Sequence, residues 1–326
     1  MTEVAARTHV TRPWTGVAAA LLSAAFFAVN GTASKLVLGA GMSSLRLVEI
    51  RSTGAAVCLL LTLLAIRPGS LRVTRHELVF LAVAGVVGIG LVQWFYFVAI
   101  GRLDVGIALL LEYLAPVLVA LWVRFVGGGE VRSRVWAALA LSVGGLAVVA
   151  QVWHGMTLNG VGVLAGFAAA GSLATYYLTG EHGLGSRDPL SLAAWTFTAA
   201  AVFWSCLQPW WTFPWELLDD RVALQGPLDG SSAPVWLLVA WVILLGTVVP
   251  YAFVLIALGR LGSARTGLIG MTEPVLASFV AWFMLSEQLS AVQIAGAAVV
   301  LTGIVLAETS RHHDVATGAL PEGVVP

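Results

Sequence analysis

Long apolar runs, separated by short clusters of charges, prolines and glycines, form the main pattern of this chain. The run from Leu78 to Leu91 contains no polar side chain, whereas membrane β-strands alternate apolar and polar residues in segments of about ten. A helix needs roughly 20 apolar residues to cross a bilayer. The pattern therefore predicts an all-α integral membrane protein with ten transmembrane helices, at 14–38, 44–66, 77–99, 105–126, 134–152, 158–180, 189–210, 235–258, 264–286 and 292–309.

Most connections between these predicted helices are short, and residues 1–13 and 310–326 are predicted to be tails. The exception is the segment 211–234, an acidic loop between the seventh and eighth helices. The first apolar run, 14–38, is too long for a signal peptide and lacks a small-x-small cleavage site, so we expect it to be retained as a membrane helix.

The amino-acid composition excludes several classes of function. Apolar residues make up 59% of the 326 residues and charged residues 10%, far from the half and the quarter that are typical of soluble domains. This excludes a water-soluble catalytic domain and makes the lipid bilayer the expected environment. Lys+Arg and Asp+Glu are balanced at 17 each, so the basic excess of a nucleic-acid binder is absent. Cys58 and Cys206 lie inside apolar runs, and no disulfide, metal or cofactor is expected.

The arginines predict the orientation, because cytoplasmic loops of membrane proteins carry an excess of Lys and Arg. With the N-terminus inside, twelve arginines fall on inner segments and five basic residues fall on outer ones. We therefore expect a multi-pass protein of the cell inner (plasma) membrane, with both termini cytoplasmic and the acidic loop outside.

An internal repeat predicts the architecture. At a constant offset of 158, the triplet 101–103 (Gly-Arg-Leu) matches 259–261, and 116–118 (Pro-Val-Leu) matches 274–276. The earlier helices repeat more weakly, at an offset near 144.

The predicted repeats are 14–152 (helices one to five) and 158–309 (helices six to ten). Because five crossings is an odd number, the second repeat must be inverted relative to the first. Inverted repeats recur in secondary transporters, which bind substrate between the repeats near the bilayer midplane and rock one repeat against the other. The pattern thus favours transport.

Several motifs resemble the EamA-type members of the drug/metabolite transporter (DMT) superfamily. Residues 273–277 (Glu-Pro-Val-Leu-Ala), continued by Ala281-Trp282 and Ser286-Glu287, are similar to that family's penultimate helix, and 112–117 with Glu130 is a degenerate copy. Asn30-Gly31, Lys35 and Arg51 are similar to its first two helices. The resemblance implies an exporter or facilitator of small metabolites, with a cavity lined by helices one, three, four, six, eight and nine and with helices five and ten at the periphery.

Two acids lie inside predicted membrane helices, where ionisable groups usually face a wet cavity or the interior of a bundle. Glu112 lies four residues before Pro116, whereas Glu273 immediately precedes Pro274, so a role found for one acid cannot be transferred to the other. Each proline can kink its helix. Either acid is a candidate proton carrier or ligand for a cationic group. The alternative is a carboxylate that is paired with an arginine, or bonded within its helix, and only fixes packing.

Uncharged polar and aromatic residues complete the candidate substrate site: Asn30, Gln93, Trp94, Tyr113, Tyr176 and Tyr251. The offset of 158 places Gln93 opposite Tyr251 in the other repeat, at the same depth. The alternative for these polar groups is hydrogen bonding between helices. Candidates for gating or structural roles are Lys35, Arg51, Pro116, Pro250 and Pro274; Pro250 is expected to open a break in the eighth helix.

The sequence therefore predicts a secondary transporter of small organic metabolites (amino-acid-like, amine or drug-like solutes), an exporter that works by alternating access. No ATP-binding motif is present, so uphill movement would use an ion gradient or the solute's own gradient. For its oligomeric state, the protein is a candidate homodimer. One alternative is a polytopic membrane enzyme, although the six histidines lie in tails, loops or helix ends. Another is a sensor or assembly protein that keeps the transporter fold without transport.

Overall fold

The computed structural model describes residues 13–100, 102–103, 105–128, 131, 133–149, 159–224, 226–285, 290–292 and 294–303. In this part, seven helical segments are long and apolar enough to cross a membrane: Trp14–Gly39, Ser44–Ile66, Glu77–Ile100, Gly160–Gly183, Pro189–Leu207, Val235–Leu261 and Ser263–Met284. Three shorter apolar helices, Ala115–Phe125, Ser133–Val148 and Ile294–Gly303, lie where the remaining predicted spans fall. The chain is a multi-pass helical membrane protein.

The labelled helices are α1 (Pro13–Gly39), α2 (Ser44–Ile66), α3 (Arg75–Gly85), α4 (Val92–Ile100), α5 (Val105–Glu112), α6 (Ala115–Phe125), α7 (Ser133–Val149), α8 (Gly160–Gly183), α9 (Pro189–Leu207), α10 (Val235–Ile243), α11 (Val249–Leu261), α12 (Ser263–Gly270) and α13 (Thr272–Leu285). Short 3₁₀ turns lie in the connections, at Pro68–Leu71, Trp210–Thr212, Trp215–Asp219 and Gly226–Leu228. Two strands, β1 (Arg221–Ala223) and β2 (Ser232–Pro234), pair antiparallel.

Local sequence explains where several helices begin and end. Thr74 and Glu77 form a reciprocal capping box that satisfies backbone N–H groups at the start of α3. The Asp188 side chain caps α9, and the next residue, Pro189, occupies a position where a missing N–H costs nothing. Gly262 has a φ of +78°, a conformation that favours glycine, and it separates α11 from α12.

Two membrane helices contain a π-helical segment in their middle. Val86–Leu91 joins α3 to α4, and Leu244–Val248 joins α10 to α11. Their first residues differ by the same 158 positions that relate the two sequence repeats. A π turn changes the hydrogen-bond register of the helix, and such segments are frequent at functional sites. The break expected near Pro250 thus takes the form of a π segment just before this proline.

Two further breaks lie at equivalent places. The helix stops between α5 and α6 at Tyr113 and Leu114, and between α12 and α13 at Met271. Pro116 and Pro274 follow these breaks within a few residues, and proline lacks the N–H that would continue the preceding turn. Each break therefore interrupts its helix beside an acid, Glu112 just before the first break and Glu273 just after the second.

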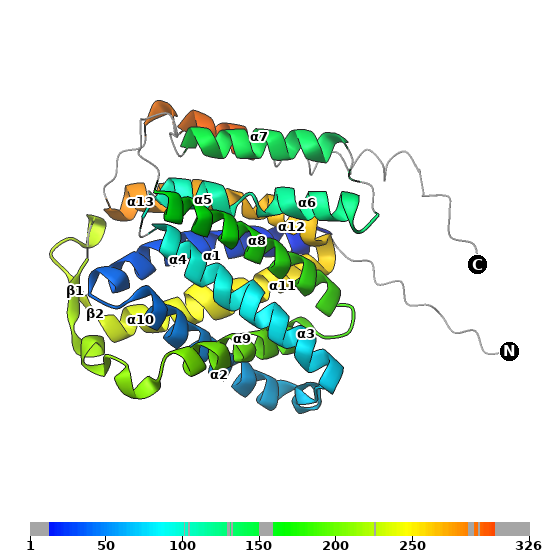
Figure 1. Cartoon of the computed structure of the whole chain (residues 1–326). Helices are drawn as coiled ribbons and strands as arrows, with labels where there is room; N and C mark the ends of the chain where they lie inside the picture. Colours follow the sequence, from blue (N-terminus) through cyan, green and yellow to red (C-terminus); the bar gives the residue numbers. More distant parts are fainter. Residues whose placement is uncertain are drawn as a thin grey trace.

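The two repeats interlock, because the first helix of each packs along the third of the other. α1 packs along α11, α8 packs along α4, and α2 packs on α9 (Figure 1). At one contact Gly16 faces Leu261, and at its counterpart Gly162 faces Leu103. Small residues at these positions let helices approach closely in a membrane.

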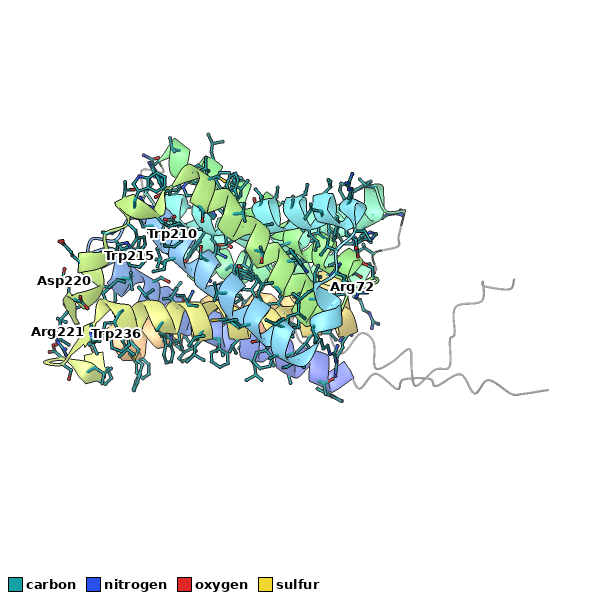
Figure 2. The ribbon with its side chains drawn as sticks, turned by 90° about the horizontal axis from the view of Figure 1, so that it is seen from below. Arg72, Trp210, Trp215, Asp220, Arg221 and Trp236 are labelled. Carbon is teal, nitrogen blue, oxygen red and sulfur yellow. The ribbon has the colours of Figure 1, made fainter. Side chains whose placement is uncertain are left out.

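The connections gather at two opposite ends of the helices. Figure 2 shows Arg72 at one end and Trp215, Asp220 and Arg221 at the other. At the Arg72 end, the Arg187 guanidinium donates to the Arg72 carbonyl at 2.6 Å. The segment predicted as an acidic loop contains the hairpin of β1 and β2, and we call its side the hairpin end.

Helix α7 forms an outer layer together with the helical residues 294–303 (Figure 1). Gly145 of α7 lies against Val300, and Gly303 lies against Ser142. The resemblance implied this peripheral position for the fifth and tenth helices, although Leu146 of α7 also reaches the wall of the central cavity.

Candidate functional site

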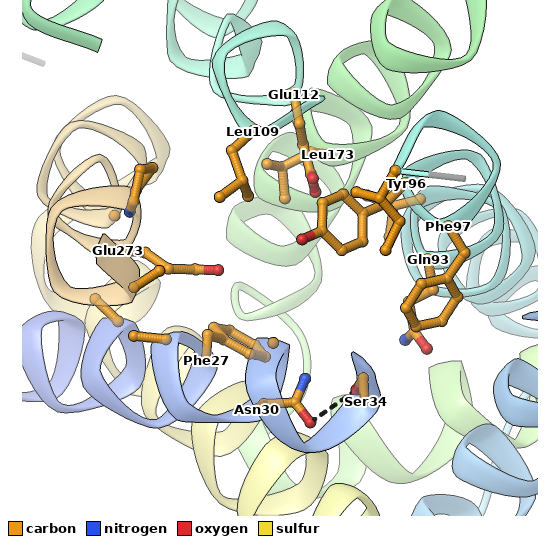
Figure 3. A pocket seen from close by; sticks show the side chains of 18 of the residues that line it. Phe27, Asn30, Ser34, Gln93, Tyr96, Phe97, Leu109, Glu112, Leu173 and Glu273 are labelled. Carbon is orange, nitrogen blue, oxygen red and sulfur yellow. Dashed lines mark hydrogen bonds between the residues drawn. The ribbon is translucent and has the colours of Figure 1, made fainter. Parts of the chain in front are cut away.

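A cavity of about 720 Å³ lies between the helices of the two repeats (Figure 3). Its wall includes Leu38, Met42 and Ser43, at the turn from α1 to α2. This turn lies at the hairpin end, because Arg46 donates to the Pro209 carbonyl at 3.4 Å. The cavity therefore extends toward the hairpin end of the molecule.

The Arg72 end of the same helices is tightly packed. Arg260 donates to the Thr15 hydroxyl, which ties the end of α11 to the start of α1. The Glu181 carboxylate accepts a hydrogen bond from the Ser263 backbone at 2.8 Å, which ties α8 to α12. These two contacts join the helices at the end opposite the hairpin, and none of the four residues lines the cavity.

Both predicted acids line this cavity, from the two helix breaks. Glu112 is the last residue of α5, and Glu273 is the second residue of α13. The Tyr113 hydroxyl donates to Glu273, and the two carboxyl groups are close enough to interact electrostatically. In Figure 3 the Tyr96 hydroxyl points into the space between Glu112 and Glu273. Such an arrangement can hold a cationic group or a proton.

Arg51 faces the same space from α2, with only 5% of its surface exposed. Its Nε donates to the Thr247 hydroxyl at 2.6 Å, and its Nη2 donates to the Gly246 carbonyl at 3.0 Å. Both partners belong to the second π segment. Arg51 also interacts electrostatically with Glu112 and Glu273. The resemblance did not place the second helix in the cavity wall, but Arg51 brings it there.

Uncharged polar groups complete the wall. The Gln93 amide donates to the Tyr251 hydroxyl at 3.4 Å, so two residues at equivalent positions of the repeats contact each other. The pseudo-twofold axis therefore passes between them. Within the described residues, Gln93 Oε1, the Tyr176 hydroxyl and the Thr266 hydroxyl are buried without a protein partner. Because an unsatisfied buried polar group is costly, these atoms are suited to bind a polar ligand or water.

Aromatic rings hold Tyr251 in place. Its ring makes edge contacts with Phe27, Tyr176 and Phe197, at centroid distances of 5.2, 5.4 and 5.0 Å. Edge-to-face pairs of this kind are favourable and directional. The Tyr251 hydroxyl is thus presented to the cavity from a rigid cluster.

The cavity brings together most of the residues that the sequence singles out. The wall contains Asn30, Lys35, Arg51, Gln93, Glu112, Tyr113, Tyr176, Tyr251, Glu273 and Pro274. Three candidates lie elsewhere. Trp94 packs on Trp204 at 6.0 Å, Pro116 lies beside Gly267, and the Pro250 carbonyl accepts a hydrogen bond from Ser23. Glu130 and Glu287 lie outside the described residues.

Sequence reasoning missed several wall residues, among them Tyr96, Phe97 and Thr266. Helical spacing contains a signal for the first two, because they follow Gln93 by three and four positions and so share its face of α4. Trp94, one position after Gln93, is rotated to another face and packs away from the cavity. Thr266 has no comparable neighbour in the sequence that would mark it.

Comparison with known proteins agrees with this arrangement of two repeats around a cavity. The model of the EamA-like transporter family matches residues 14–151 and again residues 160–309. The chain belongs to the EamA-like transporter family. The motifs around Glu112 and Glu273 that resembled this family are therefore parts of two copies of the same family domain.

Named relatives of this EamA-like chain include transporters from bacteria and an archaeon. The chain is 27% identical over 260 residues to the threonine/homoserine exporter RhtA of Salmonella typhimurium, covering 79% of this chain and 78% of that protein. It is 27% identical over 281 residues to RhtA of Escherichia coli K12, covering 84% and 85%. An uncharacterized transporter of Archaeoglobus fulgidus is 28% identical over 296 residues, covering 90% and 96%.

A solved crystal structure shares the fold of this EamA-like chain. The TM-score is 0.73 with 17% sequence identity, and the match covers 92% of this chain and 98% of the other. At 17% identity, this similarity supports the fold and gives no information on function.

Proposed function

We propose that this EamA-like chain is a secondary transporter that exports small organic solutes by alternating access. The observation that carries the proposal is the cavity between the interlocked repeats. Its wall combines two acids, two basic residues (Lys35 and Arg51) and several polar groups without a partner among the described residues. Relatives named as threonine/homoserine exporters support amino-acid-like solutes as the first to test. Binding between repeats is the arrangement that rocking-type transporters share.

The mechanism follows from how the repeats interlock. The cavity extends toward the hairpin end, while contacts such as Arg260 with Thr15 and Glu181 with Ser263 tie helices together at the Arg72 end. These features support a cycle in which the two ends open in turn. Rocking α1 and α11 against α4 and α8 would open the Arg72 end and close the other. We propose that the chain crosses the membrane ten times as two inverted five-helix repeats, with the termini and the Arg72 end cytoplasmic. The solute would then leave at the hairpin end.

The orientation can be tested with single cysteines. Ser231→Cys at the hairpin end should be labelled from outside the cell by an impermeant thiol reagent, in a background where Cys58 and Cys206 are replaced. Ser70→Cys, at the Arg72 end, is the matched control and should be labelled only after the cells are permeabilised. Labelling of Ser70→Cys alone in intact cells would reverse the proposed orientation.

Transport can be tested with the purified protein in sealed vesicles. Vesicles loaded with unlabelled threonine or homoserine should accumulate the same radiolabelled solute by counterflow, well above protein-free vesicles. A panel of amines and drug-like cations extends the test to the other solutes considered. Chromatography of the recovered solute separates transport from an enzyme, which would change the solute chemically. Binding without counterflow for every solute would instead indicate a sensor or an assembly protein and would contradict the proposal.

A further inference from the structure

Arg51 is a buried cation that is held by neutral groups. Its two hydrogen bonds go to the Thr247 hydroxyl and to the Gly246 carbonyl. No ion pair within 4.0 Å joins it to a carboxylate in the described part of the chain, and the nearby Glu49 pairs with Arg46 instead. A buried charge is costly unless it is paired. Arg51 therefore retains capacity to bind an anion.

The geometry of the side chain leaves donors for such an anion. A guanidinium has five N–H donors in a planar fork that matches a carboxylate. In Arg51 the second π segment fixes Nε and Nη2, while Nη1 forms no hydrogen bond with any described residue. The side chain lines the cavity, and its orientation is held by two bonds to a neighbouring helix. A fork that is fixed in this way loses little side-chain entropy when it binds a ligand.

The fold itself does not require this arginine. The first π segment lies at the corresponding place in its own membrane helix. The offset of 158 nevertheless places Ile89 opposite Thr247, and the offset near 144 places Trp195 opposite Arg51. The first π segment is thus built without an arginine and without a threonine at the corresponding positions. A purely structural need of the π segment would apply to both repeats, so the asymmetry favours a role in the site.

Two acids supply negative charge to the cavity wall, opposite in sign to Arg51. Glu112 and Glu273 lie at the helix breaks, and both interact electrostatically with Arg51. A solute that carries a carboxylate and an ammonium group could satisfy Arg51 with the first and an acid with the second. A simple amine would satisfy only the acids.

We infer that Arg51 is the group of the cavity that binds the solute's carboxylate, and that the second π segment positions it. The inference rests on the proposed function and adds to it a specificity-determining residue. Solutes with a free carboxylate are therefore selected over the same molecules with that group blocked.

The test compares threonine with threoninamide, which has nearly the same size and keeps the ammonium group but lacks the carboxylate charge. A hydrogen bond to a charged group contributes about 1.5–3 kcal/mol, so threonine should be preferred by at least about tenfold in competition for counterflow. In Arg51→Gln the preference should fall to near one, through loss of threonine transport with threoninamide transport kept. Arg51→Lys, which keeps the charge without the fork, should lie between.

Thr247→Val is the matched control. It removes one bond to Arg51 but leaves the guanidinium in place, so it should lower transport while keeping the preference for threonine. If Arg51 only stabilises the fold, Arg51→Gln and Thr247→Val should each lower the transport of threonine and of threoninamide by the same factor. That result would overturn the inference. Equal use of threonine and threoninamide by the wild-type protein would overturn it as well, whether or not the variants fold.

Binding provides a readout that does not depend on transport. A ligand that binds the folded state raises the unfolding temperature of the protein in detergent. In the wild type, threonine should raise the unfolding temperature more than threoninamide does. In Arg51→Gln, the two solutes should raise it by the same small amount. If no solute is transported but this difference in binding persists, the proposed function fails and the assignment of Arg51 stands. If transport occurs without any such preference, the assignment fails and the function stands.

Discussion

The two π segments occupy equivalent places in the two repeats, yet their surroundings differ in kind. The first, Val86–Leu91, is enclosed by backbone and rings, since Gly88 faces the Tyr176 backbone and Gly90 faces the Trp204 ring. It serves mainly to bring helices close together.

The second, Leu244–Val248, is surrounded by polar side chains. Gly246 faces the Asn30 amide, and Arg51 binds the Gly246 carbonyl and the Thr247 hydroxyl. The same backbone feature thus packs against helix backbone and rings in one repeat and contacts cavity-lining side chains in the other. The comparison teaches that symmetry sets the scaffold of this protein and pairs Gln93 with Tyr251, whereas the positive charge of Arg51 has no counterpart in the other repeat.

The largest effect is expected where the first repeat is most crowded. In Gly85→Ala, the added methyl group would fall on the Thr196 carbonyl oxygen, a backbone atom of α9 that cannot move away. Overpacking of this kind costs typically about 1–3 kcal/mol, so the yield of folded protein and its unfolding temperature in detergent should drop clearly.

Gly171→Ala is the control for this substitution, because no atom lies within 4 Å of the position that its methyl group would take. It should behave as the wild type does. Equal unfolding temperatures for Gly85→Ala and Gly171→Ala would show that the packing around the first π segment is looser than described.

A second prediction concerns the acids, which also differ between the repeats. Glu273 accepts a hydrogen bond from Tyr113, while Glu112 faces the cavity from the end of α5. If Glu112 carries the proton, Glu112→Gln keeps the shape of the side chain but cannot titrate. Transport driven by a proton gradient should then be lost, and exchange between equal pools of solute should survive.

The control for this variant is Glu216→Gln, which changes an exposed acid of the 3₁₀ turn Trp215–Asp219, outside the cavity wall. It should keep the pH dependence of wild-type transport. Wild-type pH dependence in a stably folded Glu112→Gln protein would rule out the coupling role and leave Glu112 as a structural carboxylate.

The smallest effects should separate the two central glycines. Gly88→Ala would press on the Tyr176 backbone at 3.0 Å. Gly246→Ala would instead overlap Oδ1 and Cγ of Asn30 and come within 3.1 Å of its Cβ, so the whole Asn30 side chain would have to turn away. We expect Gly88→Ala to lose about 1 kcal/mol or more of stability with its solute preference unchanged. Gly246→Ala should lose less stability but more transport, because Asn30 lines the cavity. The opposite order in both measurements would mean that the two segments have exchanged the roles assigned to them.

Much of this fold could be predicted from the sequence, because apolar runs of membrane length mark most helices directly. The offset of 158 also placed Gln93 opposite Tyr251, and the two side chains meet in the structure. The π segments could not be predicted, since Val86–Leu91 is as apolar as its neighbours and contains no proline. Their form depends on contacts with distant helices.

The site was predictable where a polar residue interrupts an apolar run, as at Asn30 and Glu112. It was less so where position depends on rotation about a helix. Trp94 and Tyr96 are two residues apart in the sequence, yet only Tyr96 lines the cavity. The contact of Arg51 with the second π segment joins residues 195 and 196 positions apart, and no local pattern could have indicated it.

The interlocking of the repeats has a consequence for how the protein is made. The hydroxyl of Ser23 in α1 donates to the carbonyl of Pro250 in α11, 227 residues further along the chain. During synthesis α1 therefore enters the membrane long before its main neighbour exists, with Ser23, Asn30 and Lys35 among its residues. Until α11 is made, these polar groups are exposed to lipid or covered by a temporary partner, such as a chaperone or the insertion machinery. A chain that stopped after the first repeat would leave α1 in that condition permanently, so biogenesis here is a problem of timing as well as of sequence.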